Sequence, residues 1–358
     1  MKIIHCADLH LDSKIDTLPS DKARTRRDEI LRTFEKLCDY AVKNEVSVVI
    51  IAGDMFDTSR VSIKTKGRIL QAISSADGVD FLYLSGNHDD DNFLSDLEEL
   101  PNNLKVFGEE WTKFRYGDVT ISGIKLNSKN SGTFYDNLIL EDGEFNIVTL
   151  HGQIVGYKSE EVAEIISTPR LKGKNIDYLA LGHIHKYAEG QLDFRGKYTY
   201  SGCLDGRGFD EVGGKGFVLI DVENKKASYE FVSFSSRCLY EIVLSVEGYN
   251  SWFEFMDFAI KELTDNYPST SLIKVVLRGK HAIDFVVDKE GLARRLGEEF
   301  FFAKVYDKTD LQYNVEDYAN DKSVLGEFIR AIDESDMENQ MKSEVIMCGI
   351  NALKGEEF

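Results

Sequence analysis

The chain has 358 residues, of which 42% are hydrophobic and 29% charged, and it contains only 4 prolines. This composition is typical of globular proteins and excludes a collagen-like or intrinsically disordered chain. The 62 acidic residues outnumber the 43 basic ones, and the resulting net charge of -19 argues against a protein that coats nucleic acid through bulk charge.

Apolar strands and amphipathic helices alternate through the first part of the chain. Residues 2–7 are predicted to form a buried strand, and residues 30–41 carry apolar side chains at helical spacing. Residues 46–52, VSVVIIA, form a β-branched run typical of a strand that is covered on both faces. A helix near residues 63–74 and a strand at 80–85 follow. This alternation predicts an α/β fold.

The later elements continue this pattern and then restart. Further strands are expected within 112–126 and at 145–150, 176–181, 198–201 and 216–222. A second series is expected after residues 234–237, with strands near 240–246, 272–278 and 303–306 and helices near 251–266, near 290–300 and towards the C-terminus. We therefore expect two domains, 1–236 and 237–358. From residue 238 onward the chain has 13 basic and 24 acidic residues, so the second domain is strongly acidic.

Cysteine spacing and hydropathy indicate the cellular compartment in which the protein is expected. The five cysteines are widely spaced and form no C-x-x-C motif, so neither a disulfide framework nor a zinc knuckle is predicted. No signal peptide is recognisable at the N-terminus, and no run of apolar residues is long enough to span a membrane. We therefore expect a cytoplasmic protein without a membrane segment.

Five of the expected strands end at a cluster of glycine, aspartate, asparagine or histidine residues. These clusters are Asp8-x-His10, Gly53-Asp54, Gly86-Asn87-His88-Asp89, His151-Gly152 and Gly182-His183-x-His185. A single histidine at a strand end is explained most simply by local hydrogen bonds. Because ligands bind at the carboxyl ends of strands in α/β sheets, five such clusters together predict one functional site.

The residue types in these clusters predict a centre for two divalent ions. Carboxylate, imidazole and amide donors suit Mn, Fe, Co or Zn better than Ca or Mg, and the absence of cysteine argues against structural zinc. Two such ions can lower the pKa of a bridging water, orient it for in-line attack and stabilise the leaving oxygen. Asp54, on a short turn after Gly53, is the candidate to bridge them. With Asp8 and Asp54 as the anionic ligands, the centre keeps a positive charge suited to phosphate.

His88 is expected to play a different part. It lies next to Asn87, where its imidazole can point at the substrate and protonate the leaving alkoxide as a general acid. Two roles are open for Asp89: it either holds His88 in the required tautomer or caps the following turn.

The five motifs, in this order and spacing, resemble those of the calcineurin-like metallophosphoesterase superfamily over residues 1–205. The resemblance implies a sandwich of two mixed β-sheets flanked by helices. It also implies that one ion is held by Asp8, His10, Asp54 and His185, and the second by Asp54, Asn87, His151 and His183.

Within that superfamily, three longer segments look like those of the SbcD-type DNA repair exonucleases, especially their bacterial YhaO-like branch. The segments are ADLHLDS at 7–13, GDMFDTS at 53–59 and YSGCLDGRGFDEVGGKGF at 200–217. The resemblance implies a Mn-dependent nuclease that degrades DNA from ends or cuts single strands, a smaller C-terminal α/β capping domain, a homodimer and an SbcC-type coiled-coil ATPase partner. Asp12 and Asp57 stand where many of the nucleases have glycine and histidine, and both fit the YhaO-like branch.

Two arginines are candidates for substrate binding. Arg26 lies in the densest basic stretch of the chain, which either contacts DNA phosphates or forms a solvated helix face. Arg207 either reaches a substrate phosphate or pairs with Asp210 or Glu211.

Three functions are compatible with these features. The first is a metal-dependent DNA nuclease, and the second is a phosphodiesterase for small nucleotides or other non-DNA phosphoesters. The third is a regulatory scaffold for an SbcC-type ATPase, against which the intact ligand set argues.

Overall fold

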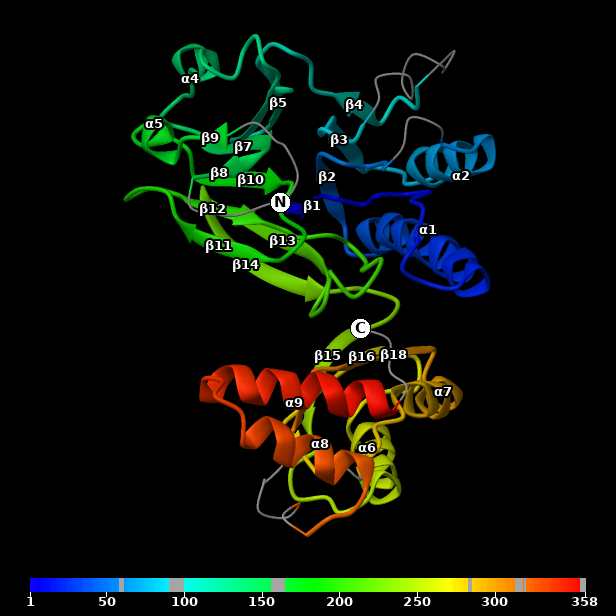
Figure 1. Ribbon diagram of the computed structural model, residues 1–358. Coiled ribbons are helices and arrows are strands. Elements are labelled where there is room, and N and C mark those ends of the chain that lie inside the picture. Colours follow the sequence, from blue (N-terminus) through cyan, green and yellow to red (C-terminus); the bar gives the residue numbers. More distant parts are fainter. Residues whose placement is uncertain are drawn as a thin grey trace. The chain divides into compact units, whose positions relative to one another are not determined.

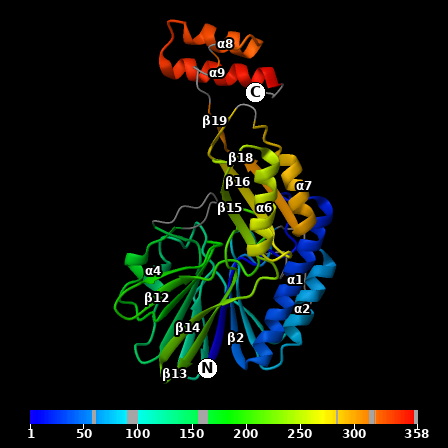
Figure 2. The ribbon, with the colours of Figure 1, turned by 90° about the horizontal axis from the view of Figure 1, so that it is seen from below.

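A computed structural model describes residues 1–57, 61–89, 100–155, 165–282, 285–312, 318 and 320–354 (Figures 1 and 2). They form two compact units, Met1–Tyr240 and Glu241–Phe358. Residues 58–59 of the GDMFDTS segment lie outside the described residues. All five cysteines are free thiols. No helix in the described ranges is both long and apolar enough to cross a bilayer.

The first sheet of the first unit is mixed and has the strand order β14-β13-β1-β2-β3-β4. Its strands are β1 (Lys2–Cys6), β2 (Val46–Ala52), β3 (Asp80–Leu84), β4 (Leu104–Val106), β13 (Gly216–Glu223) and β14 (Lys226–Ser233). Strands β1 to β4 run parallel to one another, while β13 and β14 form an antiparallel hairpin at one edge. The carboxyl ends of β1, β2 and β3 therefore meet at one edge of this sheet.

The second sheet is also mixed and has the order β11-β12-β10-β7-β6-β5. Its strands are β5 (Thr112–Tyr116), β6 (Val119–Gly123), β7 (Phe145–His151), β10 (Tyr178–Gly182), β11 (Ala188–Gln191) and β12 (Lys197–Tyr200). The four inner strands are parallel and the two edge strands are antiparallel. The prediction of two mixed sheets flanked by helices is confirmed.

The main core lies between these two sheets. Val48 and Ile50 from the first sheet share one buried cluster with Ile147 and Tyr178 from the second. This explains the continuous apolar run of β2, because its alternate side chains face this core and the helical layer. Helix α1 (Ser20–Lys43) packs against β2 and against α2 (Ile63–Ser74), which gives the helical layer of Figure 2.

A second apolar cluster covers the other face of the second sheet. It includes residues of the short helices α4 (Phe134–Asn137) and α5 (Thr168–Leu171). The two-residue strands β8 (Gln153–Ile154) and β9 (Ile165–Ile166) pair beside it. The two sheets of the first unit therefore have both of their faces covered.

The second unit has a three-stranded sheet of order β15-β16-β18. Its elements are β15 (Leu239–Ser245), α6 (Trp252–Asn266), β16 (Leu272–Arg278), β17 (Lys280–His281), α7 (Lys289–Glu299), β18 (Phe302–Asp307), β19 (Asp310–Leu311), α8 (Val324–Asp333) and α9 (Asn339–Lys354). Ser251 begins α6, because its hydroxyl accepts the backbone N–H of Glu254. Helices α8 and α9 pack on each other through Ile329, Ile346 and Ile350.

Candidate dimetal centre

The five polar clusters meet where parallel strands of both sheets end. The backbone N–H of Asp8, after β1, donates to the carbonyl of Gly53, after β2, at 3.0 Å. The backbone N–H of His183, after β10, donates to Asp8 Oδ1 at 2.8 Å and so joins the second sheet to the first. The prediction that these strand ends form one site therefore agrees with their positions.

Four of the candidate ligands have a left-handed backbone conformation. The φ angles are 51° at Asp8, 44° at His10, 52° at Asp54 and 97° at His183. Such conformations are uncommon for residues other than glycine, and each costs on the order of 1–3 kcal/mol. The surrounding sheets hold this strain at the residues that converge on the site.

Two glycines allow the strand ends to approach so closely. A Cβ atom on Gly86 would lie 2.1 Å from Asp54 Oδ1, and one on Gly182 would lie 1.9 Å from the carbonyl oxygen of Ala52. Both distances are far below van der Waals contact. A side chain at either position would push two strand ends apart, so the geometry of the site requires glycine there.

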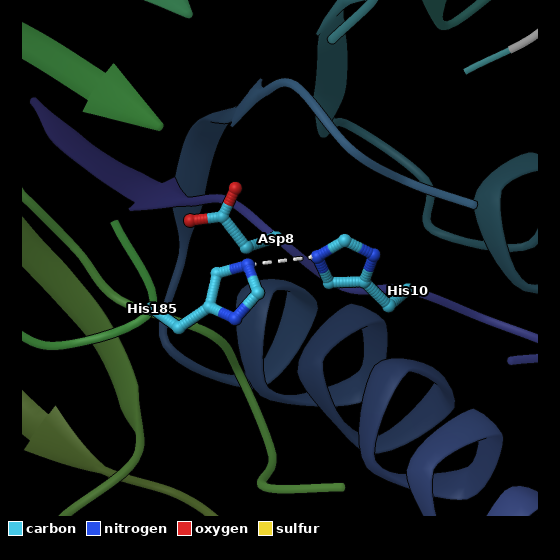
Figure 3. A group of neighbouring side chains, drawn as sticks. All are labelled: Asp8, His10 and His185. Carbon is cyan, nitrogen blue, oxygen red and sulfur yellow. Dashed lines mark hydrogen bonds between the residues drawn. The ribbon is translucent and has the colours of Figure 1, made fainter. Parts of the chain in front are cut away.

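The first group of candidate ligands is Asp8, His10 and His185, whose ligand atoms lie within 4.8 Å of one another. Figure 3 shows the two imidazoles facing each other beside the Asp8 carboxylate, with 3.0 Å between the two Nε2 atoms. The side chains of Asp8 and His10 are buried. The group comes from two clusters that are about half the chain apart in sequence.

The protonation pattern of this group fits a cation. Nδ1 of His10 lies 3.2 Å from a carboxylate oxygen of Asp57, and Nδ1 of His185 lies 2.8 Å from one of Glu211. An ionised carboxylate accepts hydrogen bonds but does not donate them, so these neighbours favour a proton on each Nδ1. Without an ion, the two facing Nε2 atoms lie within hydrogen-bond distance, which requires a proton on one of them. Oδ2 of Asp8 is buried and has no hydrogen-bond donor among the described residues. A divalent ion would displace the proton between the two rings and could take both Nε2 atoms and Oδ2 of Asp8 as ligands.

The second group is Asp54, His151 and His183, which are all buried and whose ligand atoms again lie within 4.8 Å. Asn87 adjoins it, with Oδ1 2.8 Å from Nε2 of His151. Nδ1–H of His151 donates to the carbonyl of Ala52 at 3.0 Å, which aims Nε2 at the centre of the group. The groups touch, because His151 Nδ1 lies 4.0 Å from Asp8 Oδ1.

The charge balance of the second group also favours a cation. Burial by itself lowers the pKa of His151, but the Asp54 carboxylate 3.2 Å away outweighs this and raises the pKa to about 9. The same pair lowers the pKa of Asp54 despite its burial. The protein without metal therefore keeps a proton on His151, and a metal ion would displace it.

His88 lies beside both groups but is more exposed. Its backbone N–H donates to Asp54 Oδ1 at 3.0 Å, so the position of the residue is tied to a candidate ligand. Its side chain is 27% exposed, and Nδ1 lies 3.4 Å from Asp57 Oδ1. A partly exposed imidazole at the edge of a buried cluster can reach a bound substrate.

Comparison with known proteins agrees with this geometry. Residues 1–187, which contain all five strand-end clusters, match the model of a family described as calcineurin-like phosphoesterase. The chain belongs to this family. The activity of the family, phosphoester hydrolysis, is the chemistry that two adjacent metal sites support.

Several curated relatives match a longer part of the chain than the family model does. It is 29% identical over 246 residues to the uncharacterized metallophosphoesterase YhaO of Bacillus subtilis, a match that covers 64% of this chain and 60% of YhaO. It is 24% identical over 317 residues to the DNA double-strand break repair protein Mre11 of Sulfurisphaera tokodaii, covering 81% and 76% of the two chains. It is also 24% identical over 311 residues to a subunit of the nuclease SbcCD of Staphylococcus epidermidis, covering 74% and 81%.

Asp89 has a structural role in this phosphoesterase. Its buried carboxylate accepts backbone N–H groups from Met55, Phe56 and Gly86 at 3.2, 2.8 and 2.8 Å. These bonds fasten the turn after β2 to the turn after β3. Burial and then the nearby Asp54 raise the pKa of Asp89. These contacts therefore favour a structural role for Asp89 over the alternative in which it holds His88 in one tautomer.

The carboxylate beside His88 is instead Asp57, to which the sequence analysis gave no role. Burial favours its neutral form, but hydrogen bonds from His10 and from Ser13, at 2.6 Å, together with Arg207, lower its pKa. Asp57 therefore stays ionised between a candidate ligand and the candidate acid. Its position three residues after Asp54, on the same turn, is the sequence signal that places it there.

The expectation that Arg26 contacts a substrate phosphate is wrong. Its side chain is fully buried on the inner face of α1, where it pairs with the equally buried Asp205. It also donates to the carbonyl of Gly206, to Ser236 and to Glu29. These contacts use all five of its N–H groups, so none is left for a ligand.

Arg207 adopts the second of its two alternatives and pairs with Glu211. Its Nε and Nη2 donate to Glu211 Oε1 at 2.9 and 2.8 Å. Nη1 lies 3.3 Å from Asp57, a contact that the sequence did not indicate. Glu211 is buried, and it keeps its charge because His185 and Arg207 outweigh the effect of burial and lower its pKa.

Proposed function

We propose that the protein is a metal-dependent DNA nuclease that hydrolyses phosphodiester bonds in DNA repair. The observation that carries the proposal is the pair of adjoining ligand groups with a partly exposed histidine, His88, at their edge. Family membership supports phosphoester hydrolysis. The similarity to the DNA repair protein Mre11 and to the SbcCD nuclease supports DNA as the substrate. The proposal includes exonuclease activity and the cutting of single strands.

In this proposal one ion is held by Asp8, His10, Asp54 and His185, and the other by Asp54, Asn87, His151 and His183. Two divalent ions, which we propose to be Mn²⁺, supply an activated water nucleophile and neutralise charge on the phosphate. Mixed nitrogen and oxygen donors favour a transition metal over Mg²⁺ or Ca²⁺.

The chain itself supplies a proton donor. The leaving group in DNA cleavage is a sugar alkoxide, which departs poorly unless it is protonated. His88 is exposed enough to reach that oxygen and is fixed through its backbone to Asp54. A positioned general acid of this kind contributes about 10²- to 10⁴-fold in rate.

A groove beside the centre supports a polyanionic substrate. It has a volume of about 650 Å³ and lies between the start of α1, the start of α2 and Asp12, two residues beyond His10. Five cationic side chains line it, Arg24, Arg27, Arg32, Lys64 and Arg68, against three carboxylates, Asp12, Asp28 and Glu29. This is a local excess of positive charge on a chain whose net charge is -19.

The cations of this groove are only partly neutralised. Asp28 pairs with Arg32 and Arg68, at 2.8 and 2.7 Å. In the described part of the chain, Arg24, Arg27 and Lys64 have no carboxylate within 4 Å. Arginine and lysine side chains without a carboxylate partner suit the phosphates of a nucleic-acid strand.

Several further features belong to the same proposal. The first domain, 1–236, would carry the reaction, and the second, 237–358, would be a capping domain that selects the substrate. Similarity to a component of the SbcCD nuclease supports an SbcC-type ATPase partner, and we also propose a homodimer in the cytoplasm. The acidic second domain is not suited to bind DNA through bulk charge, so a partner or metal ions would assist it.

Cleavage of three substrates tests the proposal. Wild type, His88→Ala and Asp54→Ala are incubated with Mn²⁺ and end-labelled duplex DNA, single-stranded DNA or bis(4-nitrophenyl) phosphate. A nitrophenolate leaves without protonation, so His88→Ala is expected to lose DNA cleavage and keep much of the aryl diester hydrolysis. Asp54→Ala is expected to lose both, because it removes a ligand. Gly108→Ala, at an open surface position, serves as the control.

The other outcomes would redirect the assignment. Hydrolysis of the aryl diester with both DNA substrates untouched would contradict the nuclease and favour an enzyme for small phosphoesters. Activity on none of the three would favour the regulatory scaffold.

A further inference from the structure

Five side chains around the first ligand group form a closed ring. The Nε2 atoms of His10 and His185 face each other at 3.0 Å, and Nδ1 of His185 lies 2.8 Å from a carboxylate oxygen of Glu211. Glu211 meets Arg207 at 2.8 Å, and Arg207 meets Asp57 at 3.3 Å. Asp57 closes the ring at His10 Nδ1, 3.2 Å away.

From this ring we infer that Arg207 is a positioning residue for the first metal site. It holds Asp57 and Glu211 in place, and each carboxylate in turn fixes the orientation of one ligand histidine. The inference rests on the proposed metal site and goes beyond the proposed reaction, because it assigns metal affinity to a side chain that is not one of the proposed ligands.

The role of the two carboxylates follows from the chemistry of imidazole. A neutral histidine binds a metal through one nitrogen only if the proton is on the other. Carboxylate oxygens of Asp57 and Glu211 lie 3.2 and 2.8 Å from the two Nδ1 atoms, which favours a proton there and leaves the Nε2 atoms to bind an ion. If either carboxylate turned away, its histidine could rotate or change tautomer, and the geometry of the site would be lost.

Arginine is suited to hold both carboxylates at once. Two N–H groups of Arg207 donate to Glu211 Oε1, at 2.9 and 2.8 Å, while the third nitrogen faces Asp57. Nη2 also lies 3.4 Å from Nδ1 of His185, so Arg207 adjoins one ligand histidine directly. Oε2 of Glu211 accepts the backbone N–H of Arg207 at 2.7 Å, which fixes the carboxylate at both oxygens. A lysine offers one compact charge and cannot match this planar arrangement.

Charge gives a second reason for an arginine at this position. The side chain of Glu211 is 2% exposed and that of Asp57 is 22% exposed. Two carboxylates in such surroundings repel each other and lose solvation, which favours turning one of them away. The Arg207 side chain, 16% exposed, offsets both effects from between them.

The chain offers a control arginine of similar exposure. Arg195 is 17% exposed and also bridges two carboxylates, those of Asp177, at 2.9 Å, and Asp142, at 2.5 Å. Its hydrogen bonds reach no candidate metal ligand. Loss of Arg195 therefore reproduces the loss of a half-buried, bridging arginine in the same domain without touching the ring.

The test measures Mn²⁺ binding and imidazole tautomers in the full chain, without any substrate. Calorimetric titration of wild type is expected to show two ions. Arg207→Ala should weaken one of the two by about 10- to 100-fold and leave the other unchanged. Arg207→Lys should recover only part of this loss, and Arg195→Ala should bind both ions as wild type does.

A spectroscopic readout separates positioning from a general loss of structure. Nitrogen-15 NMR of wild type loaded with diamagnetic Zn²⁺ should show His10 and His185 as Nδ1–H imidazoles bound through Nε2, and Arg207→Ala should lose this pattern at one or both. Glu211→Gln offers a second variant with the same expectation for His185 if Arg207→Ala does not fold.

Two results would overturn the inference: wild-type affinity at both sites in Arg207→Ala, or an equal loss in Arg195→Ala. Neither depends on catalysis, so a protein that binds two ions and cleaves no DNA would contradict the proposed function while leaving this inference intact. Failure of wild type to bind two ions would overturn the metal site and both conclusions with it.

Discussion

Replacement of Arg26 by methionine should destabilise the first unit severely. The substitution keeps an apolar stem of similar length but leaves the buried Asp205 without its cation. Hydrogen bonds to Asp205 from Thr33 and Ser236 would remain, at 2.7 Å each. Breaking a buried ion pair by removing one partner typically costs about 3–5 kcal/mol, because the other charge stays buried.

The matched control for this change lies on the same helix. Arg32 is 64% exposed and pairs with Asp28 at 2.8 Å, so Arg32→Met should cost only about 0.3–0.5 kcal/mol. Urea unfolding followed by circular dichroism would give the free energies of unfolding.

A double variant keeps the prediction testable if Arg26→Met is too unstable to purify. Arg26→Met combined with Asp205→Asn removes the stranded charge and should be more stable than Arg26→Met alone. An equal loss of unfolding free energy in Arg26→Met and Arg32→Met would refute this account of Arg26. So would a double variant that is less stable than Arg26→Met alone.

Three further changes have specific expected results. Asp57→Asn, at saturating Mn²⁺, should slow DNA cleavage by about 10- to 100-fold and bis(4-nitrophenyl) phosphate hydrolysis much less; equal losses in a steady-state assay would argue against an effect on the proton donor. Burial lowers the pKa of His5 in the folded protein to about 3. Below the ordinary pKa of 6.5, only the unfolded chain gains a proton on His5, so the folded protein becomes less stable as the pH is lowered. Metal-free wild type should lose about 2 kcal/mol more unfolding free energy than His5→Gln between pH 6.5 and 5, and parallel pH profiles would contradict this. Gly86→Ala should abolish Mn²⁺ binding in calorimetry by displacing Asp54, whereas Gly108→Ala, in open space, should bind normally; retained binding in Gly86→Ala would show that the turn relaxes.

The fold and the candidate metal ligands were predictable because their signals are local. Residues 46–52 form an uninterrupted apolar run that ends at Gly53 and Asp54, and β2 has the same bounds in the structure. Similar runs precede His151 and His183. A strand and its final polar residues are adjacent in sequence, so the pattern indicates both the element and the ligand.

The contacts around the ligands were not predictable, because they join distant segments. Glu211 meets His185 across 25 intervening residues that include two strands. Arg207 meets Asp57 although the two residues are about 150 positions apart in sequence. No pattern within a short window distinguishes these partners from ordinary surface charges. Their roles became visible only when both sheets brought the loops together.

Arg26 is a different case, because the sequence contained the signal. It is spaced by three and four residues from Ala23 and Ile30, which are both buried on the inner face of α1. An arginine on the apolar stripe of a helix is expected to face the core and to have a buried partner there. The density of basic residues around Arg26 favours a surface role, whereas its helical position indicates the core.

The most direct test of the dimetal centre is electron paramagnetic resonance of the protein loaded with Mn²⁺, combined with metal analysis. We expect two Mn²⁺ ions per chain and a spectrum of magnetically coupled ions, since two-metal sites hold their ions about 3.5–4 Å apart. Asp54→Ala should abolish the coupled signal. A wild-type protein with a single ion, or with two uncoupled ions, would contradict the account.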